Sequence, residues 1–321
     1  MLKNMTLRRV ALATMLLFIC FLFVLFPQSE DKISLKGESI EYTNYHTTHE
    51  IFMVNKDNYV ARTNVLLDED STENKVRGIL EYLIIGGKKE SSIPNGFRSI
   101  IPAGTEIRSV EIKEGLLKID FSKEILEIDE ALEEKMLESI IYSLTSIDGI
   151  KGILIYVEGD LLTVLPKTKT SLPSILTRDI GVNKVYDLVD TKDITKTTVY
   201  YVGKNNDDYY YVPVTKVDNG KKDKIKVIID ELSSGPTYED NLMSFMNLKT
   251  ELLNYEIKED NMYLTFNNYI LDNLEEKSIL EEVIYTISLS IADNYDVKEV
   301  IFLIGDEEIT KSVVKTCENV T

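Results

Sequence analysis

The chain has 321 residues, of which 44% are hydrophobic, with 15 glycines and 7 prolines. It is long and apolar enough for two ordinary domains, and its composition excludes a disordered or fibrous protein. The formal net charge of −18 argues against a nucleic-acid-binding protein, because little in such a chain would neutralise phosphates.

The sequence of residues 1–29 indicates the cellular location of the chain. Lys3, Arg8 and Arg9 precede a mostly apolar run at 10–26. A basic end followed by such a run is typical of a signal peptide or a membrane span. The sequence FPQSE that follows has no cleavage pattern of small residues, so we expect an uncleaved transmembrane helix with its basic end in the cytoplasm. The prediction is a single-pass protein of the cell membrane whose C-terminal domains are extracytoplasmic.

The cysteines leave an alternative. The two cysteines are Cys20 and Cys317, and Cys20 lies inside the apolar run. The rest of the chain holds one thiol and cannot form an internal disulfide. Lipidation of Cys20 would make the chain a lipoprotein, although Leu-Phe-Ile stands where a lipobox has a small residue just before the cysteine. A buried N-terminal core helix is a third interpretation, which leaves the flanking charges unexplained.

Beyond about residue 48 the sequence repeats itself. The segment EIKEGLLKIDF at 111–121 aligns without a gap with EIKEDNMYLTF at 256–266. In both, apolar residues alternate on either side of a turn, which predicts a half-buried β-hairpin. The alternating apolar residues are Ile112, Leu117, Ile119 and Phe121 in the first copy, and Ile257, Met262, Leu264 and Phe266 in the second.

The other predicted elements also occur in pairs. Each copy opens with strands, beginning at 51–54 and at 198–202. A helix with one apolar stripe follows, formed by Val76, Ile79, Leu80, Leu83 and Ile84, or by Ile225, Ile228, Ile229 and Leu232. After the hairpin, a second helix is predicted from the spacing of Leu132, Met136, Ile140 and Leu144, or of Leu280, Ile284 and Ile287. A β-branched strand closes each copy, at 152–160 and 300–307.

Both copies end their first helix with a similar stop signal. Gly86 and Gly87 follow the helix of the first copy, and Gly235 and Pro236 follow that of the second. Glycine suits the left-handed position just past a helix, and proline cannot continue one.

The pattern predicts an α+β protein with an N-terminal transmembrane helix and then two similar two-layer domains. Each domain has two helices on one face of a small mixed β-sheet, in the order strand–helix–hairpin–helix–strand, because the helix stripes and the alternating strands must bury each other. The predicted segments are an anchor at 1–29, a spacer at 30–47, a first domain at 48–165, a linker at 166–196 that carries a strand or short helix of its own, a second domain at 197–309 and a tail at 310–321.

Motifs of the first copy carry a family resemblance. Before the hairpin stands Ile-Pro-x-Gly-Thr, with Pro102, Gly104 and Thr105, and the closing strand ends in Val-Glu-Gly at Gly159. With the glycine helix ends and the N-terminal attachment, the chain resembles tandem GerMN-domain proteins of sporulation and germination. The second copy keeps Leu-Ser-Ser-Gly-Pro but lacks both motifs.

The resemblance implies a protein without catalytic activity. GerMN domains resemble the ring-building modules of the channel between mother cell and forespore, and tandem GerMN proteins are thought to help assemble that envelope complex. The resemblance brings no cofactor, no catalytic residue and no metal ligand. The partners it implies are envelope or sporulation-complex proteins and the membrane, and a duplicated module could also associate with itself.

Motifs that suggest chemistry have structural interpretations. His46 and His49 form His-x-x-His among poor helix formers in a polar spacer, so we expect no metal site. Residues 68–74 are acid-rich, but a calcium loop also needs glycine at its sixth and glutamate at its twelfth position, so we favour a negatively charged helix entry. Ser-x-x-Lys at 29–32 and 312–315 lacks the companion motifs of penicillin-binding enzymes.

Three functions remain in view. The favoured one is a non-catalytic, membrane-anchored extracytoplasmic scaffold that acts through protein contacts in sporulation or in another cell-envelope complex. The alternative is a binding module for peptidoglycan or another wall polymer, in which Tyr209 and Tyr211 share one face of a strand and Tyr210 lies on the other. A hydrolase with paired carboxylates ranks third, because no acid stands out from a solvated face.

Overall fold

The computed structural model describes residues 48–314 apart from 68, 207, 221 and 237–240. The predicted anchor (1–29) and spacer (30–47) lie outside the described residues. Among the residues that the structure does describe, no helix is long and apolar enough to cross a membrane.

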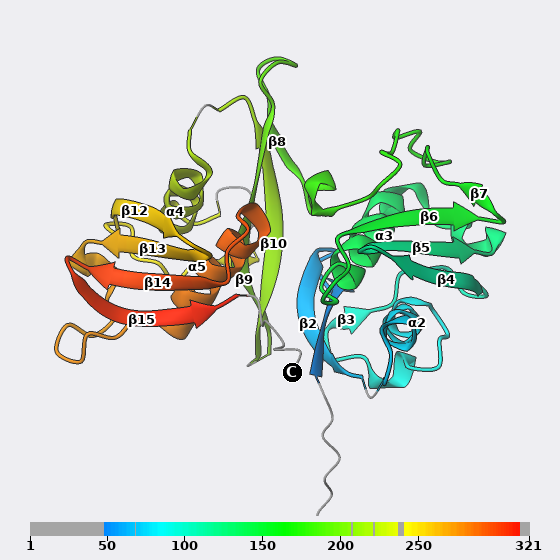
Figure 1. Ribbon diagram of the computed structural model, residues 1–321, viewed down its shortest axis with the longest axis horizontal. Helices are drawn as coiled ribbons and strands as arrows, with labels where there is room; N and C mark the ends of the chain where they lie inside the picture. The colour runs from blue at the N-terminus through cyan, green and yellow to red at the C-terminus, as the bar shows by residue number, and fades with distance from the viewer. Residues whose placement is uncertain (1–47, 68, 207, 221, 237–240, 315–321) are drawn as a thin grey trace, which may run out of the picture. The chain divides into compact units, whose positions relative to one another are not determined.

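The elements follow the predicted order (Figure 1). The first repeat contains β1 (Thr48–Asn55), β2 (Val60–Leu66), α2 (Thr72–Leu83), η1 (Glu90–Ser92), β3 (Phe97–Arg98), β4 (Ile107–Lys113), β5 (Leu116–Phe121), η2 (Lys123–Leu126), α3 (Glu130–Leu144), β6 (Gly152–Val157) and β7 (Asp160–Leu161). The linker contains η3 (Arg178–Ile180) and β8 (Val185–Asp187). The second repeat contains β9 (Thr195–Asn205), β10 (Asp208–Asp218), α4 (Lys224–Ser234), β11 (Leu242–Met243), β12 (Leu252–Lys258), β13 (Asn261–Phe266), η4 (Asn268–Ile270), α5 (Glu281–Asn294), β14 (Glu299–Ile304) and β15 (Glu307–Val313).

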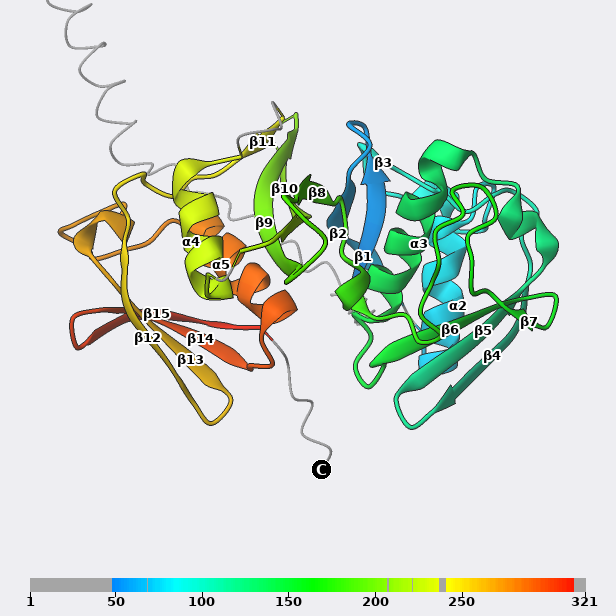
Figure 2. The same cartoon turned by 90° about the horizontal axis from the view of Figure 1, so that it is seen from above.

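In each repeat the helices lie between two sheets (Figure 2). Helices α2 and α3 pack on the mixed sheet β4-β5-β6-β7, and α4 and α5 pack on β12-β13-β14-β15. The predicted α+β class is confirmed. The predicted two-layer arrangement is incomplete, because the opening strands form a separate sheet that covers the other face of the helices. Sequence periodicity shows that a strand is apolar but not which strand it pairs with, so the third layer was missed.

The opening strands of both repeats join one sheet of order β11-β9-β10-β2-β1-β3, with β8 pairing beside β10. Strand β10 meets β2 in an antiparallel bridge between Tyr211 and Arg62. Farther along, β10 pairs in parallel with β8 of the linker. The linker therefore carries both a strand and a short helix, where the sequence predicted one or the other.

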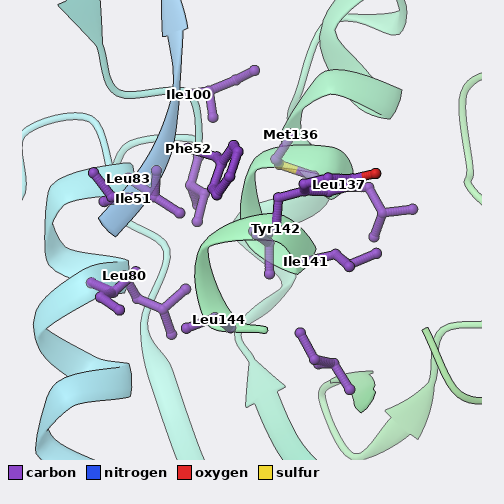
Figure 3. Packing of buried hydrophobic residues seen from close by; sticks show 14 of the residues in the cluster. Ile51, Phe52, Leu80, Leu83, Ile100, Met136, Leu137, Ile141, Tyr142 and Leu144 are labelled. Carbon is purple, nitrogen blue, oxygen red and sulfur yellow. The ribbon is translucent and has the colours of Figure 1, made fainter. Parts of the chain in front are cut away.

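Two hydrophobic clusters form the core, one mainly in each repeat. Figure 3 shows the first, where Leu80 and Leu83 of α2 and Tyr142 of α3 lie around Ile51 and Phe52 of β1. The clusters are interleaved at the shared sheet, because Tyr200 of β9 belongs to the first and Ala61 of β2 to the second.

Both predicted hairpins form, β4–β5 and β12–β13. Their inward residues are buried, with two exceptions at matching positions: Ile112 is 39% exposed and Ile257 is 48% exposed. Both isoleucines lie opposite buried residues, Leu117 and Met262, on the apolar face of the predicted half-buried hairpin. They stay partly exposed because β4 and β12 are edge strands of their sheets.

The two helix ends differ more than their sequences suggest. Helix α4 ends at Ser234, and Gly235 follows with φ +74°, as predicted, with Pro236 after it. Helix α2 is capped by Ile84 in an extended conformation, so Gly86, with φ +75°, lies in a turn beyond the helix end and not directly after it. Gly87 closes that turn, and a Cβ there would lie 2.3 Å from the backbone oxygen of Glu81.

Candidate functional site

The Ile-Pro-x-Gly-Thr motif forms the turn that leads into β4. The backbone N–H of Thr105 donates to the carbonyl of Pro102 at 3.3 Å, and the Thr105 hydroxyl donates to the same oxygen at 2.7 Å. Gly104 has φ +80°, which fits the third residue of a type II turn and favours glycine there. The motif is therefore a local turn whose threonine is buried and satisfied.

The Val-Glu-Gly motif closes the same corner of the first repeat. The Glu158 carboxylate accepts from the backbone N–H of Lys123 at 3.1 Å and pairs with the Arg108 guanidinium. The N–H of Gly159 donates to the Asp120 carboxylate at 3.0 Å. Pro102, Gly104, Thr105, Arg108 and Glu158 are called the motif corner. Arg108 and Glu158, with Asp120 of β5, tie β4, β5, η2 and the β6–β7 turn together.

The second repeat keeps the turn with other residues. The N–H of Thr250 donates to the carbonyl of Asn247 at 2.9 Å, and the Asn247 side chain accepts from the N–H of Lys249 at 2.9 Å. By the hairpin alignment Leu253 takes the place of Arg108, and by strand register Gly305 takes that of Glu158. The charged motif corner of the first repeat is thus replaced by an exposed leucine and a glycine.

Arg178 of the linker joins the two repeats. Its guanidinium donates to the Tyr142 carbonyl at 3.0 Å and to the Asp293 carboxylate at 2.5 Å, and it lies over the rings of Phe52 and Tyr142. The Tyr200 hydroxyl donates to the other Asp293 oxygen at 2.8 Å. Burial would lower the pKa of Arg178, but Asp293 outweighs it and raises that pKa above its ordinary value. Burial, aided by Asp293, also raises the pKa of Tyr200.

Asn183 makes a second junction, at the gap between β2 and β10. Its side-chain amide donates to the carbonyls of Val60 and Pro213, each at 2.7 Å, and its side-chain oxygen accepts from the N–H of Val60 at 3.0 Å. Its backbone N–H donates to the buried Glu138 carboxylate at 3.1 Å. One amide therefore supplies bonds that a strand ladder would otherwise make. Arg178, Asn183 and Asp293, with the groups they bind, are called the linker junction.

A pocket of about 310 Å³ opens beside this junction, lined by residues of both charges. Lys184 donates to Glu138 at 2.5 Å and lies 3.3 Å from Glu134. Burial would lower the pKa of Lys184, but Glu138 outweighs it and raises the pKa. Burial lowers the pKa of the neighbouring Lys135. Lys184 thus binds both acids in an ion-pair network at the edge of the pocket.

The three tyrosines of β10 do not form one binding surface. Tyr210 is buried, and its hydroxyl accepts from the Asn55 side chain at 2.9 Å across the repeats. Tyr211 packs against the Tyr285 ring, and burial raises its pKa to about 12. Tyr209 is 45% exposed and contacts a different ring, that of Phe245. Core or interface packing accounts for two of the three.

The remaining sequence candidates are described only in part. His49 lies in β1 and burial lowers its pKa, whereas His46 lies outside the described residues. Within the described ranges no group of three or more His, Cys, Asp or Glu could hold a metal ion. The described part of the acid-rich stretch, residues 69–74, leads into α2 as predicted, with Ser71 as N-cap accepting from the Asn74 N–H at 3.2 Å.

Sequence reasoning missed the linker junction. Arg178 and Asn183 stand in a stretch with scattered charge and no periodicity, and Asp293 ends an amphipathic helix like many exposed acids. The sequence offered one signal of a turn here, the glycine at 181 between the two linker residues, and the structure gives it φ +80°. Such contacts join positions far apart in the chain, and local patterns do not encode them.

Comparison with known proteins matches this architecture. Residues 45–163 and 198–310 match the Germane family, described as "Sporulation and spore germination". Spore germination protein GerM of Bacillus subtilis (strain 168) is 32% identical over 280 residues, which cover 85% of this chain and 75% of that protein. The solved structure of the tandem GerMN domains of the sporulation protein GerM from Bacillus subtilis superposes with a TM-score of 0.74 at 31% identity, covering 81% of this chain and 92% of that one. The chain belongs to the Germane (GerMN) family and is a GerM-like sporulation and germination protein with two GerMN domains in tandem.

Proposed function

We propose that this chain is a non-catalytic scaffold, anchored in the cell membrane by residues 1–29, whose extracytoplasmic GerMN domains assemble a sporulation or other envelope complex through protein contacts. The family and its GerM relative support the setting. The basic and apolar N-terminal sequence supports the anchor.

The observation that carries the scaffold role is the linker junction. Its most buried polar groups serve to hold the repeats: Arg178 binds Asp293, and Glu138 binds Lys184 and the Asn183 N–H. Perturbed pKa values also arise in structural ion-pair networks, and the raised pKa values of Arg178 and Lys184 come from such partners, Asp293 and Glu138. A tandem joined in this way presents two surfaces on one chain, which raises the effective concentration for a second contact once the first is made.

The test is cross-linking of the full chain in membranes of a spore-forming host that encodes it. Defined adducts with other envelope proteins should appear during sporulation, and a chain without residues 1–29 should lose them. An unrelated transmembrane helix in place of 1–29 should restore them. Absence of any heteromeric adduct, or turnover of labelled peptidoglycan by the purified chain, would contradict the proposal.

Binding to a wall polymer is the second candidate, favoured only by the exposed Tyr209 ring with Lys204 above it. Tyr269 is a matched control, because it is similarly exposed and has Lys249 above its ring at the same 5.5 Å. Retention on cell-wall sacculi that Tyr209→Ala abolishes and Tyr269→Ala keeps would support this candidate. Equal retention by all three chains would remove it.

A further inference from the structure

One edge strand of each four-stranded sheet ends in the same three residues before its turn, and no other described strand pairs with that edge. Edge strand β4 ends in Glu-Ile-Lys at 111–113, and edge strand β12 ends in Glu-Ile-Lys at 256–258. All six side chains are exposed, so packing within a repeat does not require them to match. The preceding residues of the same strands differ, IRSV in one and LLNY in the other. This segment is called the edge triplet.

The backbone of each triplet is available for pairing. Lys113 lies opposite Leu116 and Lys258 opposite Asn261 across two-residue turns, and such flanking residues form hydrogen-bonded pairs. Because these pairs alternate along an antiparallel ladder, the N–H and C=O of Ile112 and of Ile257 point away from their own hairpins. An edge of this kind is a template for another strand.

The charges of the triplet select one way of pairing. When two triplets run antiparallel with isoleucine opposite isoleucine, Glu111 faces Lys258 and Lys113 faces Glu256. A parallel pairing in the same register would place like charges opposite each other, which is unfavourable. We propose that the edge triplet of one copy of this chain pairs antiparallel with an edge triplet of a second copy, isoleucine against isoleucine.

This contact extends a sheet from one copy into the next. The overlap is short, since both triplets lie beside turns, and it buries far less than the roughly 1,000 Å² of a stable interface. A single contact is therefore weak. Each chain carries two triplets, so one copy can bind two others, and copies held close together gain from the second contact.

Two charge variants of the full chain in detergent test the pairing. One carries Lys113→Glu and Lys258→Glu, and the other carries Glu111→Lys and Glu256→Lys. Each alone sets like charges opposite in every triplet pairing, so analytical ultracentrifugation should show self-association about tenfold weaker than for the wild type. An equimolar mixture should recover wild-type association, because each acidic edge then meets a basic edge.

The matched control for the first variant is Lys277→Glu with Lys311→Glu, which makes the same change in net charge at exposed ion pairs involving β15, the opposite edge from β12 in the second repeat's sheet. It should associate like the wild type. A mixture of the two charge variants that associates no better than either alone would overturn the proposal. So would a wild-type chain that stays monomeric at the highest concentrations reached.

Disulfide cross-linking tests the register of the proposed strand pairing. The native cysteines are first replaced by Cys20→Ser and Cys317→Ser, so that only introduced cysteines can react. Residues opposite each other in a hydrogen-bonded pair have Cα atoms about 5.5 Å apart, within disulfide range. Ile112→Cys and Ile257→Cys, alone or mixed, should form disulfides between copies. Ser109→Cys, three residues along β4, should not link to Ile257→Cys. Equal linking from position 109, or none from 112 and 257, would contradict the register.

Discussion

The two repeats reach the same corner by different chemistry. In the first, Gly104 turns the chain and Arg108 pairs with Glu158. In the second, the Asn247 side chain fixes the turn, and Leu253 and Gly305 leave the corner uncharged. The topology is the same in both, so the family motifs shape one surface while the buried apolar positions hold the fold.

One buried hydrogen bond, called the serine pin, is in contrast the same in both repeats. The hydroxyl of Ser143 in α3 accepts from the N–H of Phe52 in β1 at 2.9 Å. The hydroxyl of Ser290 in α5 accepts from the N–H of Tyr200 in β9 at 2.8 Å. Each serine hydroxyl thus joins the second helix of its repeat to the opening strand in the same way.

The largest expected effect comes from breaking the asymmetric junction. Asp293→Ala leaves Arg178 without its carboxylate and the Tyr200 hydroxyl without its acceptor. Removing one partner of a buried ion pair costs about 3–5 kcal/mol. Urea unfolding followed by circular dichroism should show this loss. Asp230→Ala, in an exposed pair with Lys222, should change stability by less than about 0.5 kcal/mol. Equal effects would contradict the role of the junction.

Next come the two serine pins. Ser143→Ala and Ser290→Ala each remove an acceptor from a strand N–H, at a cost of about 1–3 kcal/mol for an unsatisfied buried group. Thermal unfolding should show losses of similar size in the two variants. A large loss in one and none in the other would mean that only one repeat depends on its pin.

The turns should respond differently. Gly104→Ala places a Cβ on a residue with φ +80°, which costs about 1–2 kcal/mol. Lys249, the aligned residue, is not among the positive-φ positions, so Lys249→Ala should stay within about 0.5 kcal/mol. Chemical denaturation of both variants measures the difference, and a tolerated Gly104→Ala would mean that the turn can adopt another form.

The smallest effect is the pH dependence that Glu133 of the first repeat contributes. Burial would raise the pKa of Glu133, but hydrogen bonds from the N–H groups of Thr168 and Lys167 and from the Thr168 hydroxyl outweigh it and lower the pKa. Its contribution to stability is thus full above the ordinary value of 4.5 and is lost as pH falls through the lower folded value. Glu133→Gln should flatten the loss of melting temperature below pH 4.5. The same loss of melting temperature below pH 4.5 in the variant and the wild type would contradict this role of Glu133.

Much of the fold could be predicted because local periodicity encodes it. Leu117, Ile119 and Phe121 alternate and are buried as a strand, and Val76 and Ile79 form the buried stripe of a helix. The shared sheet could not be predicted. Its β10–β2 contact joins strands about 150 residues apart, and no local sequence pattern marks which strands pair. At the site, the Pro102–Thr105 turn was visible in sequence, whereas Arg178 acts only through residues more than thirty positions away.

The Asn183 contacts bear on where the chain can be cut. A fragment that stops at residue 165 contains Val60 but not the amide that binds its N–H and carbonyl. A fragment that starts at residue 197 likewise lacks the donor to Pro213. The sequence duplicates a module, yet each half lacks the Asn183 side chain that binds its strand next to the other half. A chimera that exchanges one half between relatives would therefore have to include residues 178–187.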